Sequence, residues 1–300
     1  MKKYRIYQVD AFTTEKLKGN PAGVVSNADG LTESQMQALA REFNNSETAF
    51  ILTPTASDHD VWVRFFTPAT EVPTCGHATI AAHYVRALEN KLPSCTVIQK
   101  IGVGKLPVEI IKENDGYRIV MTQGKIEFSA PIPSAERNGI ITALGLSDDD
   151  LHEHCPIQIV STGHSKVMIG IRSRDILNSL KPDFTRLADI SDAIKCNGYF
   201  VFTFDSDSDD ILTHGRMFAP AIGIPEDPVT GNANGPLGAY LIHHKLVPHD
   251  KDLFSFKSKQ GEAIRRAGIV EVIVEIEKGV PTKVKVAGEA VIVFKTEIEF

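Results

Sequence analysis

The chain has 300 residues, with 42% hydrophobic residues, 23% charged residues and a formal net charge of −6 at pH 7. This length can bury a substantial core in one or two domains. The acidic balance disfavours a nucleic-acid-binding protein, because such proteins cluster Lys and Arg on one surface. No stretch approaches the roughly 18 apolar residues of a membrane span, and no apolar core of a signal peptide follows the N-terminal lysines. We therefore expect a cytoplasmic protein with no nucleic acid or membrane partner, whose four cysteines are reduced thiols.

Short runs of β-branched and aromatic residues dominate the chain, and fewer segments show helical spacing. The runs predict strands at 4–12, 62–66, 108–112, 117–122, 167–171, 199–204, 269–277 and 291–300. Thr32 and Gln35 form a capping-box pattern at the start of one predicted helix. The helices are predicted at 32–43, 76–90, 134–144, 185–195 and 231–245. Many strands with a few helices between them indicate an α+β fold.

The helices predicted at 76–90 and 231–245 are apolar nearly all round. The first carries charges only near its end, at Arg86 and Glu89, and the second carries none before Lys245. A helix with this pattern is typically buried and does not lie on a surface. Both also contain small residues that let strands approach closely. A sheet wrapped around each helix would satisfy both observations.

A repeated pattern, R-x-F-x-P-A-x-x-x-P, occurs at 64–73 and again at 216–225. Each copy leads into one of the two apolar helices, which begin at Gly76 and Gly231. Because a helix N-terminus carries unpaired N–H groups and a positive dipole end, it binds anions. Two such ends facing each other would hold a small carboxylate. The alternative is that both glycines merely permit tight turns.

Several motifs in order along the chain resemble those of the PhzF-like (phenazine biosynthesis-like) isomerase family. They are VDAF at 9–12, GNPAGV at 19–24, SETAF at 46–50, FTP at 66–68, CGHAT at 75–79 and EDPVTGNA at 226–233. The resemblance covers essentially the whole chain. It implies the diaminopimelate epimerase-like fold, with two pseudo-symmetric lobes that are each a β-barrel around a central helix. Lobe one would span 1–117, completed by a returning C-terminal strand at 285–300, and lobe two would span 118–284.

The resemblance also implies an isomerase that moves a proton on a small carboxylate-bearing substrate, without a metal or an organic cofactor, and that forms a homodimer. Glu47 would be the general acid/base, and a carboxyl beside apolar residues can deliver a proton to carbon near neutral pH. The family's active-site serine after the second glycine is Asn232 in this chain, which puts the same choice of substrate in doubt. The implied catalytic residues are Glu47, His77 and Asp227, and the implied substrate contacts are Asn20, Cys75, Gly76, Gly231 and Asn232.

Two other functions remain open from the residues. Epimerases of this fold place one cysteine in each lobe, but the repeat has Cys75 in the first position and Thr230 in the second. A hydroxyl with no activating base is too weak an acid for that task, so the sequence favours isomerisation with one acid/base. A non-catalytic protein that binds small carboxylates is the third possibility.

Overall fold

The computed structural model describes residues 1–250 and 252–300, which form two compact units. Unit 1 consists of Met1–Thr122 and Ala287–Phe300, and unit 2 consists of Gln123–Val286. The boundary expected at 117/118 falls inside a strand, because 116–121 pair with 108–113. In the part of the chain that is described, no helix has both the length and the apolar character needed to span a membrane.

Unit 1 is a sheet-rich unit with two helices. Its strands are β1 (Lys3–Ala11), β2 (Asn20–Val25), β3 (Thr48–Leu52), β4 (Val61–Phe66), β5 (Glu71–Val72), β6 (Cys95–Ile101), β7 (Gly104–Glu113), β8 (Gly116–Thr122) and β18 (Ala290–Glu299), and its helices are α1 (Glu33–Phe43) and α2 (Gly76–Asn90). The C-terminal strand β18 pairs with β1, and the sheet continues through β2, β3, β4, β6, β7 and β8.

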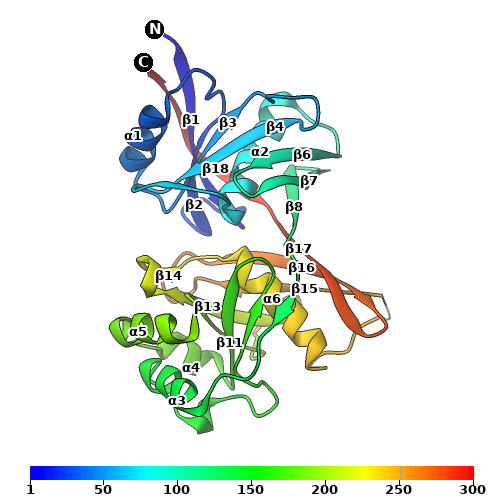
Figure 1. Cartoon of the computed structure of the whole chain (residues 1–300). Helices are drawn as coiled ribbons and strands as arrows, with labels where there is room; N and C mark the ends of the chain where they lie inside the picture. Colours follow the sequence, from blue (N-terminus) through cyan, green and yellow to red (C-terminus); the bar gives the residue numbers. More distant parts are fainter. Residues whose placement is uncertain (251) are drawn as a thin grey trace. The chain divides into compact units, whose positions relative to one another are not determined.

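Helix α2 lies inside unit 1, against strands from both ends of that sheet. It contacts β1, β2, β3, β7, β8 and β18, so the sheet curves around it (Figure 1). Ala78, Ala81 and Ala82 are completely buried, and such small side chains allow the strands to come close. The burial expected from the apolar pattern is confirmed for this helix, and it extends to the polar residues His77, Thr79 and His83.

Helix α1 covers another part of unit 1 and begins with the predicted capping box. Thr32 accepts a hydrogen bond from the Gln35 backbone, and Gln35 bonds back to the Thr32 backbone. Met36 and Leu39 pack into a core with Phe50 and other residues of the sheet. The helix ends at Asn44, whose positive φ of 52° turns the chain toward β3.

Among the described residues, unit 2 combines nine strands with four α-helices. Its strands are β9 (Glu127–Phe128), β10 (Gln158–Ser161), β11 (Ser165–Ile171), β12 (Tyr199–Thr203), β13 (Thr213–Ala219), β14 (Ile224–Asp227), β15 (Leu253–Gln260), β16 (Gly268–Glu277) and β17 (Val280–Gly288), and its helices are α3 (Ser134–Ala143), α4 (Arg174–Ser179), α5 (Phe184–Ile194) and α6 (Gly231–His243) with two short 3-10 turns at Asp148–Asp150 and Pro220–Ile222. The last residues of β17, from Ala287 onward, belong to unit 1.

Helix α6 is the buried helix of unit 2 and contacts β10, β11 and β16 (Figure 1). Its residues from Ala233 to Ile242 are all buried. A Cβ atom added at Gly238 would lie 2.6 Å from Val272 Cγ1, so the glycine is needed for the close approach of β16. The other helices belong to a separate core, in which α3 and α5 pack on each other and Leu187 and Tyr199 are completely buried.

Candidate active site

The two copies of the repeat fold in the same way, each within its own unit. Arg64 on β4 forms a two-bond fork with Glu71 on β5, at 2.7 Å for both bonds. Arg216 on β13 forms the same fork with Glu226 on β14, at 3.0 and 2.7 Å. Each guanidinium also lies over the phenylalanine two residues later, 5.1 Å from the Phe66 ring and 5.0 Å from the Phe218 ring. In each unit, the arginine of the R-x-F pattern therefore joins the two strands of a hairpin through an ion pair, and the buried helix follows this hairpin.

The helices that follow the two hairpins begin without a capping side chain. Cys75 is the N-cap of α2 and Thr230 is the N-cap of α6, and neither side chain bonds to the amides of its helix. The first N–H groups of a helix have no partner within the helix. Both helix starts therefore offer backbone donors and a positive dipole end to an anion.

Glu47 is held at the start of β3 by the backbone around it. Its carbonyl accepts a hydrogen bond of 3.3 Å from the N–H of Gly23 on β2. Asn45, two residues earlier, exchanges hydrogen bonds with Gln8 of β1 at 2.9 and 3.2 Å. Because β2 and β3 are neighbouring parallel strands, this backbone is fixed while the Glu47 side chain keeps 17% of its surface exposed.

Glu47, Cys75 and His77 lie together in unit 1. The His77 Nε2 atom is 3.5 Å from Glu47 Oε2 and 3.3 Å from Ser46 Oγ. The other ring nitrogen, Nδ1, is 3.5 Å from Cys75 Sγ. One donor atom from each of Glu47, Cys75 and His77 lies within 4.8 Å of the other two. The contact of 3.5 Å between His77 and Glu47 is longer than an ordinary hydrogen bond, so the carboxylate can turn toward another partner.

The site residues expected from the second copy lie in unit 2. Thr230 Oγ1 donates a hydrogen bond to Asp227 Oδ2. Gln260 on β15 joins this pair, because its amide donates to Asp227 O at 2.8 Å and to Thr230 Oγ1 at 3.0 Å. The Gln260 oxygen accepts from Thr230 N at 3.1 Å and from Asn234 Nδ2 at 3.0 Å. Gln260 therefore fixes the start of α6, and nothing near it in the sequence predicted this role.

Two further expected residues have distinct surroundings. Asn232 Oδ1 is buried next to the start of α6 and has no hydrogen-bond partner among the described residues. Gly231 is itself buried, and its carbonyl accepts from the Gln123 amide at 2.9 Å. Asn20 lies in unit 1 as the first residue of β2, where it is 1% exposed and pairs with Ala11.

Lys166 on β11 was not among the site residues predicted from the sequence. This side chain is 8% exposed, and its Nζ donates to the Ser165 carbonyl at 3.1 Å. Burial lowers the pKa of Lys166, and the charge of Asp227 acts in the opposite direction. A lysine enclosed so completely is rare, and that rarity is visible only once the fold is known.

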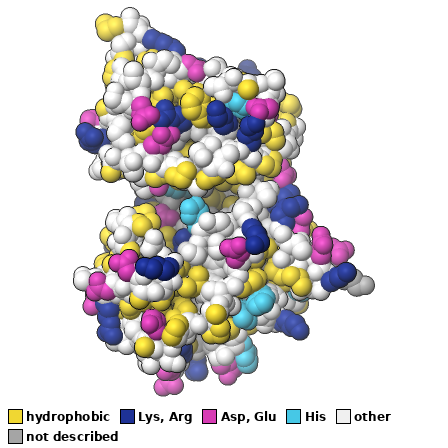
Figure 2. Space-filling model, in the orientation of Figure 1, with side chains coloured by type: hydrophobic (Ala, Val, Ile, Leu, Met, Phe, Trp, Pro, Cys, Tyr) yellow, Lys and Arg dark blue, Asp and Glu magenta, His cyan; other side chains and the backbone are white. Residues whose placement is uncertain are grey.

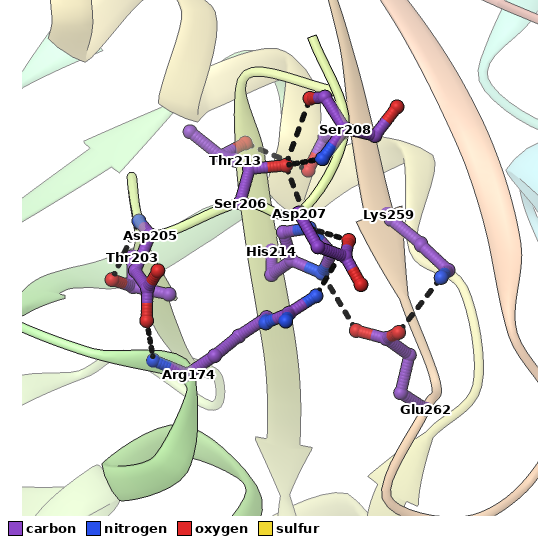
Figure 3. Close-up of polar contacts among 11 residues, drawn as sticks. Arg174, Thr203, Asp205, Ser206, Asp207, Ser208, Thr213, His214, Lys259 and Glu262 are labelled. Atoms are coloured by element: carbon purple, nitrogen blue, oxygen red, sulfur yellow. Dashed lines mark hydrogen bonds and ion pairs between the residues drawn. The ribbon is translucent and has the colours of Figure 1, made fainter. Parts of the chain in front are cut away.

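A second polar cluster of unit 2, drawn in Figure 3, surrounds His214 on β13. The His214 side chain is completely buried, and its Nδ1 lies 2.6 Å from Glu262 Oε2. Its Nε2 lies 3.1 Å from Ser206 Oγ, and Lys259 holds the other Glu262 oxygen at 2.8 Å. The hydrogen bond with His214 holds the pKa of Glu262 well below its usual range, at about 2. Every polar atom of this imidazole has a partner, so the cluster is structural.

The distribution of charge on the surface agrees with the acidic composition. On the face drawn in Figure 2, lysines and arginines are interspersed with acidic side chains and do not gather into one basic patch.

The family model for phenazine biosynthesis-like proteins matches residues 9–296. The chain therefore belongs to the phenazine biosynthesis-like (PhzC-PhzF) family.

Curated relatives and a solved structure cover almost the entire chain. An uncharacterised isomerase of Clostridium acetobutylicum is 60% identical over 99% of both chains. The uncharacterised isomerase YddE of Escherichia coli is 50% identical over 98% of both. The trans-2,3-dihydro-3-hydroxyanthranilate isomerase of Pseudomonas fluorescens is 32% identical over 94% of this chain and 95% of that protein. The crystal structure of a PhzF family protein from Bacillus anthracis has a TM-score of 0.89 at 30% identity, with both chains fully covered. The protein is thus an enzyme of an isomerase family.

Proposed function

We propose that this protein is a cofactor-independent isomerase that moves a proton on a small carboxylate-bearing substrate, with Glu47 as the general acid/base. The observation that carries the proposal is the position of the Glu47 carboxylate. It is partly exposed, 3.5 Å from His77 Nε2, and lies beside the uncapped start of α2. A carboxylate with a loose partner can accept a proton from carbon and return it to another atom.

The start of α2 supplies the second element of the proposed chemistry. The N–H groups of Gly76 and the residues after it would bind the substrate carboxylate, because Cys75 does not cap them. His77 would orient Glu47 and donate to a polar substituent. In unit 2, the contacts expected from Asp227, Gly231 and Asn232 remain predictions. The buried Asn232 oxygen, which has no partner among the described residues, supports a role in hydrogen bonding to substrate.

The reaction class receives support from the relatives, one of which is named a trans-2,3-dihydro-3-hydroxyanthranilate isomerase at 32% identity. The change of the family serine to Asn232 argues that the substrate itself can differ. The homodimer and the cytoplasmic location expected from the sequence remain predictions.

The test is incorporation of solvent deuterium into a panel of small carboxylates, including the dihydro-hydroxyanthranilate of that relative. The wild-type enzyme should exchange one carbon-bound proton of its substrate, and Glu47→Gln should not. Glu42→Gln, an exposed glutamate five residues earlier on α1, is the matched control and should exchange at the wild-type rate. Exchange by Glu47→Gln at the wild-type rate would disprove the proposed mechanism. Saturable binding without any exchange would instead indicate a non-catalytic binding protein.

An amino-acid epimerase is the second candidate, and the contact between Cys75 and His77 favours it. A thiol 3.5 Å from an imidazole nitrogen can transfer its proton to that ring and become a nucleophile or base. The corresponding position of unit 2 is Thr230, whose hydroxyl donates to Asp227. Exchange at the α-carbon of an amino acid that is lost in Cys75→Ser and retained in Glu47→Gln would support this candidate over ours.

A further inference from the structure

The donor atoms around His77 match the ligand preferences of a thiophilic divalent cation. Zinc is bound in proteins by cysteine sulfur, histidine nitrogen and carboxylate oxygen. Glu47, Cys75 and His77 offer one of each, and the three atoms lie within 4.8 Å of one another. No metal was expected here from the sequence, because the family resemblance implies an isomerase without one.

One donor atom from each residue lies within 4.8 Å of the other two, up to about 1 Å wider than in a formed site. In tetrahedral zinc sites, bonds of about 2.0–2.3 Å place neighbouring ligand atoms about 3.3–3.6 Å apart. The separations of Cys75 Sγ and of Glu47 Oε2 from the nearest His77 nitrogen are both 3.5 Å. The two contacts use different ring nitrogens, so one side chain must shift by about 1 Å to meet a single ion. Glu47 can make this shift, because 17% of its side chain is exposed and its partner contact is loose.

The charges of the site also fit a divalent cation. A thiolate, a carboxylate and a neutral imidazole together balance two positive charges. The thiolate is the form that binds metals, and Cys75 is the N-cap of α2, where the helix dipole favours a negative charge. Binding releases the thiol proton to solvent, so the affinity should rise with pH. Three protein ligands leave the fourth position to water.

From this arrangement we infer that Glu47, Cys75 and His77 form a reversible binding site for zinc or a similar thiophilic cation, and that the bound cation inhibits the enzyme. The binding site depends only on the geometry of unit 1. The inhibition rests on the proposed function, because the cation would occupy the Glu47 carboxylate that we assign to proton transfer. Zinc would thus act here as a regulator that competes with the reaction, and EDTA would reverse it.

Binding is tested with Cd²⁺, whose thiolate complexes give an ultraviolet charge-transfer band. Metal-free full-length protein should bind one Cd²⁺ per chain with this band, and Zn²⁺ should displace it. Cys75→Ser should lose the band, and Glu47→Gln should weaken binding by at least about tenfold. Cys95→Ser is the matched control, since Cys95 is also a thiol of unit 1 but lies on β6 outside the cluster, and it should bind as the wild type does.

Circular dichroism of each variant verifies the fold, and Cys75→Ala replaces Cys75→Ser if the latter does not fold. A band that persists in Cys75→Ser or disappears in Cys95→Ser would overturn the assignment, as would its absence from the wild type. These measurements need no turnover, so they stand apart from the outcome of the Glu47→Gln exchange assay.

Inhibition is tested with the deuterium-exchange assay of the wild-type enzyme. Saturating Zn²⁺ should reduce exchange to the level of Glu47→Gln, and EDTA should restore it fully. Exchange at the unperturbed rate with one Zn²⁺ bound would overturn the inhibitory role while leaving the binding site intact. If the enzyme shows no exchange under any condition, the proposed function fails, and the inhibitory role fails with it.

Discussion

Unit 1 and unit 2 each hold a histidine against a glutamate, and the two pairs differ in how completely they are satisfied. In unit 2, His214 is buried and contacts Glu262 at 2.6 Å, while Ser206 and Lys259 take the remaining positions (Figure 3). In unit 1, His77 contacts Glu47 at 3.5 Å, and its other nitrogen meets only a thiol, Cys75. A saturated network stabilises a fold. The looser pair beside the uncapped start of α2 is the one to which we assign substrate binding in our proposal.

The two copies of the repeat have the same hairpins but different side chains at the helix starts. The Arg–Glu forks and the rings beneath them match in the two units, so the hairpins that deliver α2 and α6 are equivalent. The side chains at the helix starts do not match. Unit 1 has a thiol and an imidazole there, whereas unit 2 has a hydroxyl bonded to a carboxylate and clamped by Gln260. The two units therefore share this framework of hairpins and differ in the side chains at their helix starts.

The largest expected effect distinguishes the two histidine–glutamate pairs by activity. Glu47→Gln should lower the rate of deuterium exchange by about 10²–10⁴-fold, the usual contribution of a general acid/base, with little change in stability. Glu262→Gln should keep the wild-type rate in the same assay, because Glu262 contacts only the structural network. A comparable rate loss in both variants would show that the two pairs do not differ in role.

The next effect tests the two Arg–Glu forks by stability. Arg216 and Glu226 have side chains that are 8% and 9% exposed, so Glu226→Gln leaves a buried charge uncompensated and should cost about 3 kcal/mol. Glu71 is 39% exposed, and Arg64 retains Glu33 at 2.8 Å, so Glu71→Gln should cost about 1 kcal/mol or less. The free energies of unfolding in urea provide the comparison. Equal losses of unfolding free energy in the two variants would mean that burial does not govern the strength of these Arg–Glu ion pairs.

The sequence predicted many of the parts of the fold that have a local signal, but the long strands β6, β15 and β17 were overlooked. The range of α2 agrees at both ends, and the capping box of Thr32 and Gln35 forms as the pattern indicated. Helix α4 was overlooked because its six residues are too few to show a helical period. Short strands such as β5 and β9 were overlooked because they are defined by their partners and have little pattern of their own.

In the candidate site, too, only the contacts between residues close in sequence could be predicted. Cys75 and His77 are two residues apart at a helix start, so their contact follows from the motif. Glu47 was identified by resemblance, and its contact with His77 depends on the β2–β3 pairing that no local pattern reveals. The hydrogen bonds of Gln260 join residues 26 or more positions apart along the chain. Long-range polar contacts of this kind need the fold before they can be recognised.

A smaller effect concerns the pH dependence of the His214 network. Because the pKa of Glu262 is lowered from 4.5 to about 2 in the folded state, its ionised form stabilises the protein. This contribution is complete above pH 4.5 and is lost as the pH falls toward 2. Glu262→Ala should cost about 1–3 kcal/mol at neutral pH by leaving a buried partner unsatisfied, and the cost should shrink below pH 4.5.

Urea unfolding at several pH values measures this difference, and Glu277→Ala, an exposed residue at the end of β16, is the control. A cost for Glu262→Ala that stays constant between pH 7 and pH 2.5 would contradict the proposed stabilisation by the ionised carboxylate.

The smallest effect involves His83, a histidine of α2 that has no charged partner in hydrogen-bond contact among the described residues. Its Nε2 lies 3.0 Å from Gln99 Oε1, and its Nδ1 has no hydrogen-bond partner in the part of the chain that is described. Burial lowers the pKa of His83 from 6.5 to about 4. The unfolded chain therefore binds a proton between these values that the folded protein does not, and stability should fall as the pH drops from 6.5 to 4.

His83→Gln should make the urea-unfolding free energy less dependent on pH across this window, whereas His249→Gln, which changes an exposed histidine, should retain the wild-type slope. An unchanged slope in His83→Gln would mean that burial does not lower the pKa of His83 in the folded state. The two buried histidines differ in their partners, because His214 has the Glu262 carboxylate at 2.6 Å and His83 has the Gln99 amide at 3.0 Å. Burial alone thus does not determine what a histidine does in this fold, and the partner at hydrogen-bond distance does.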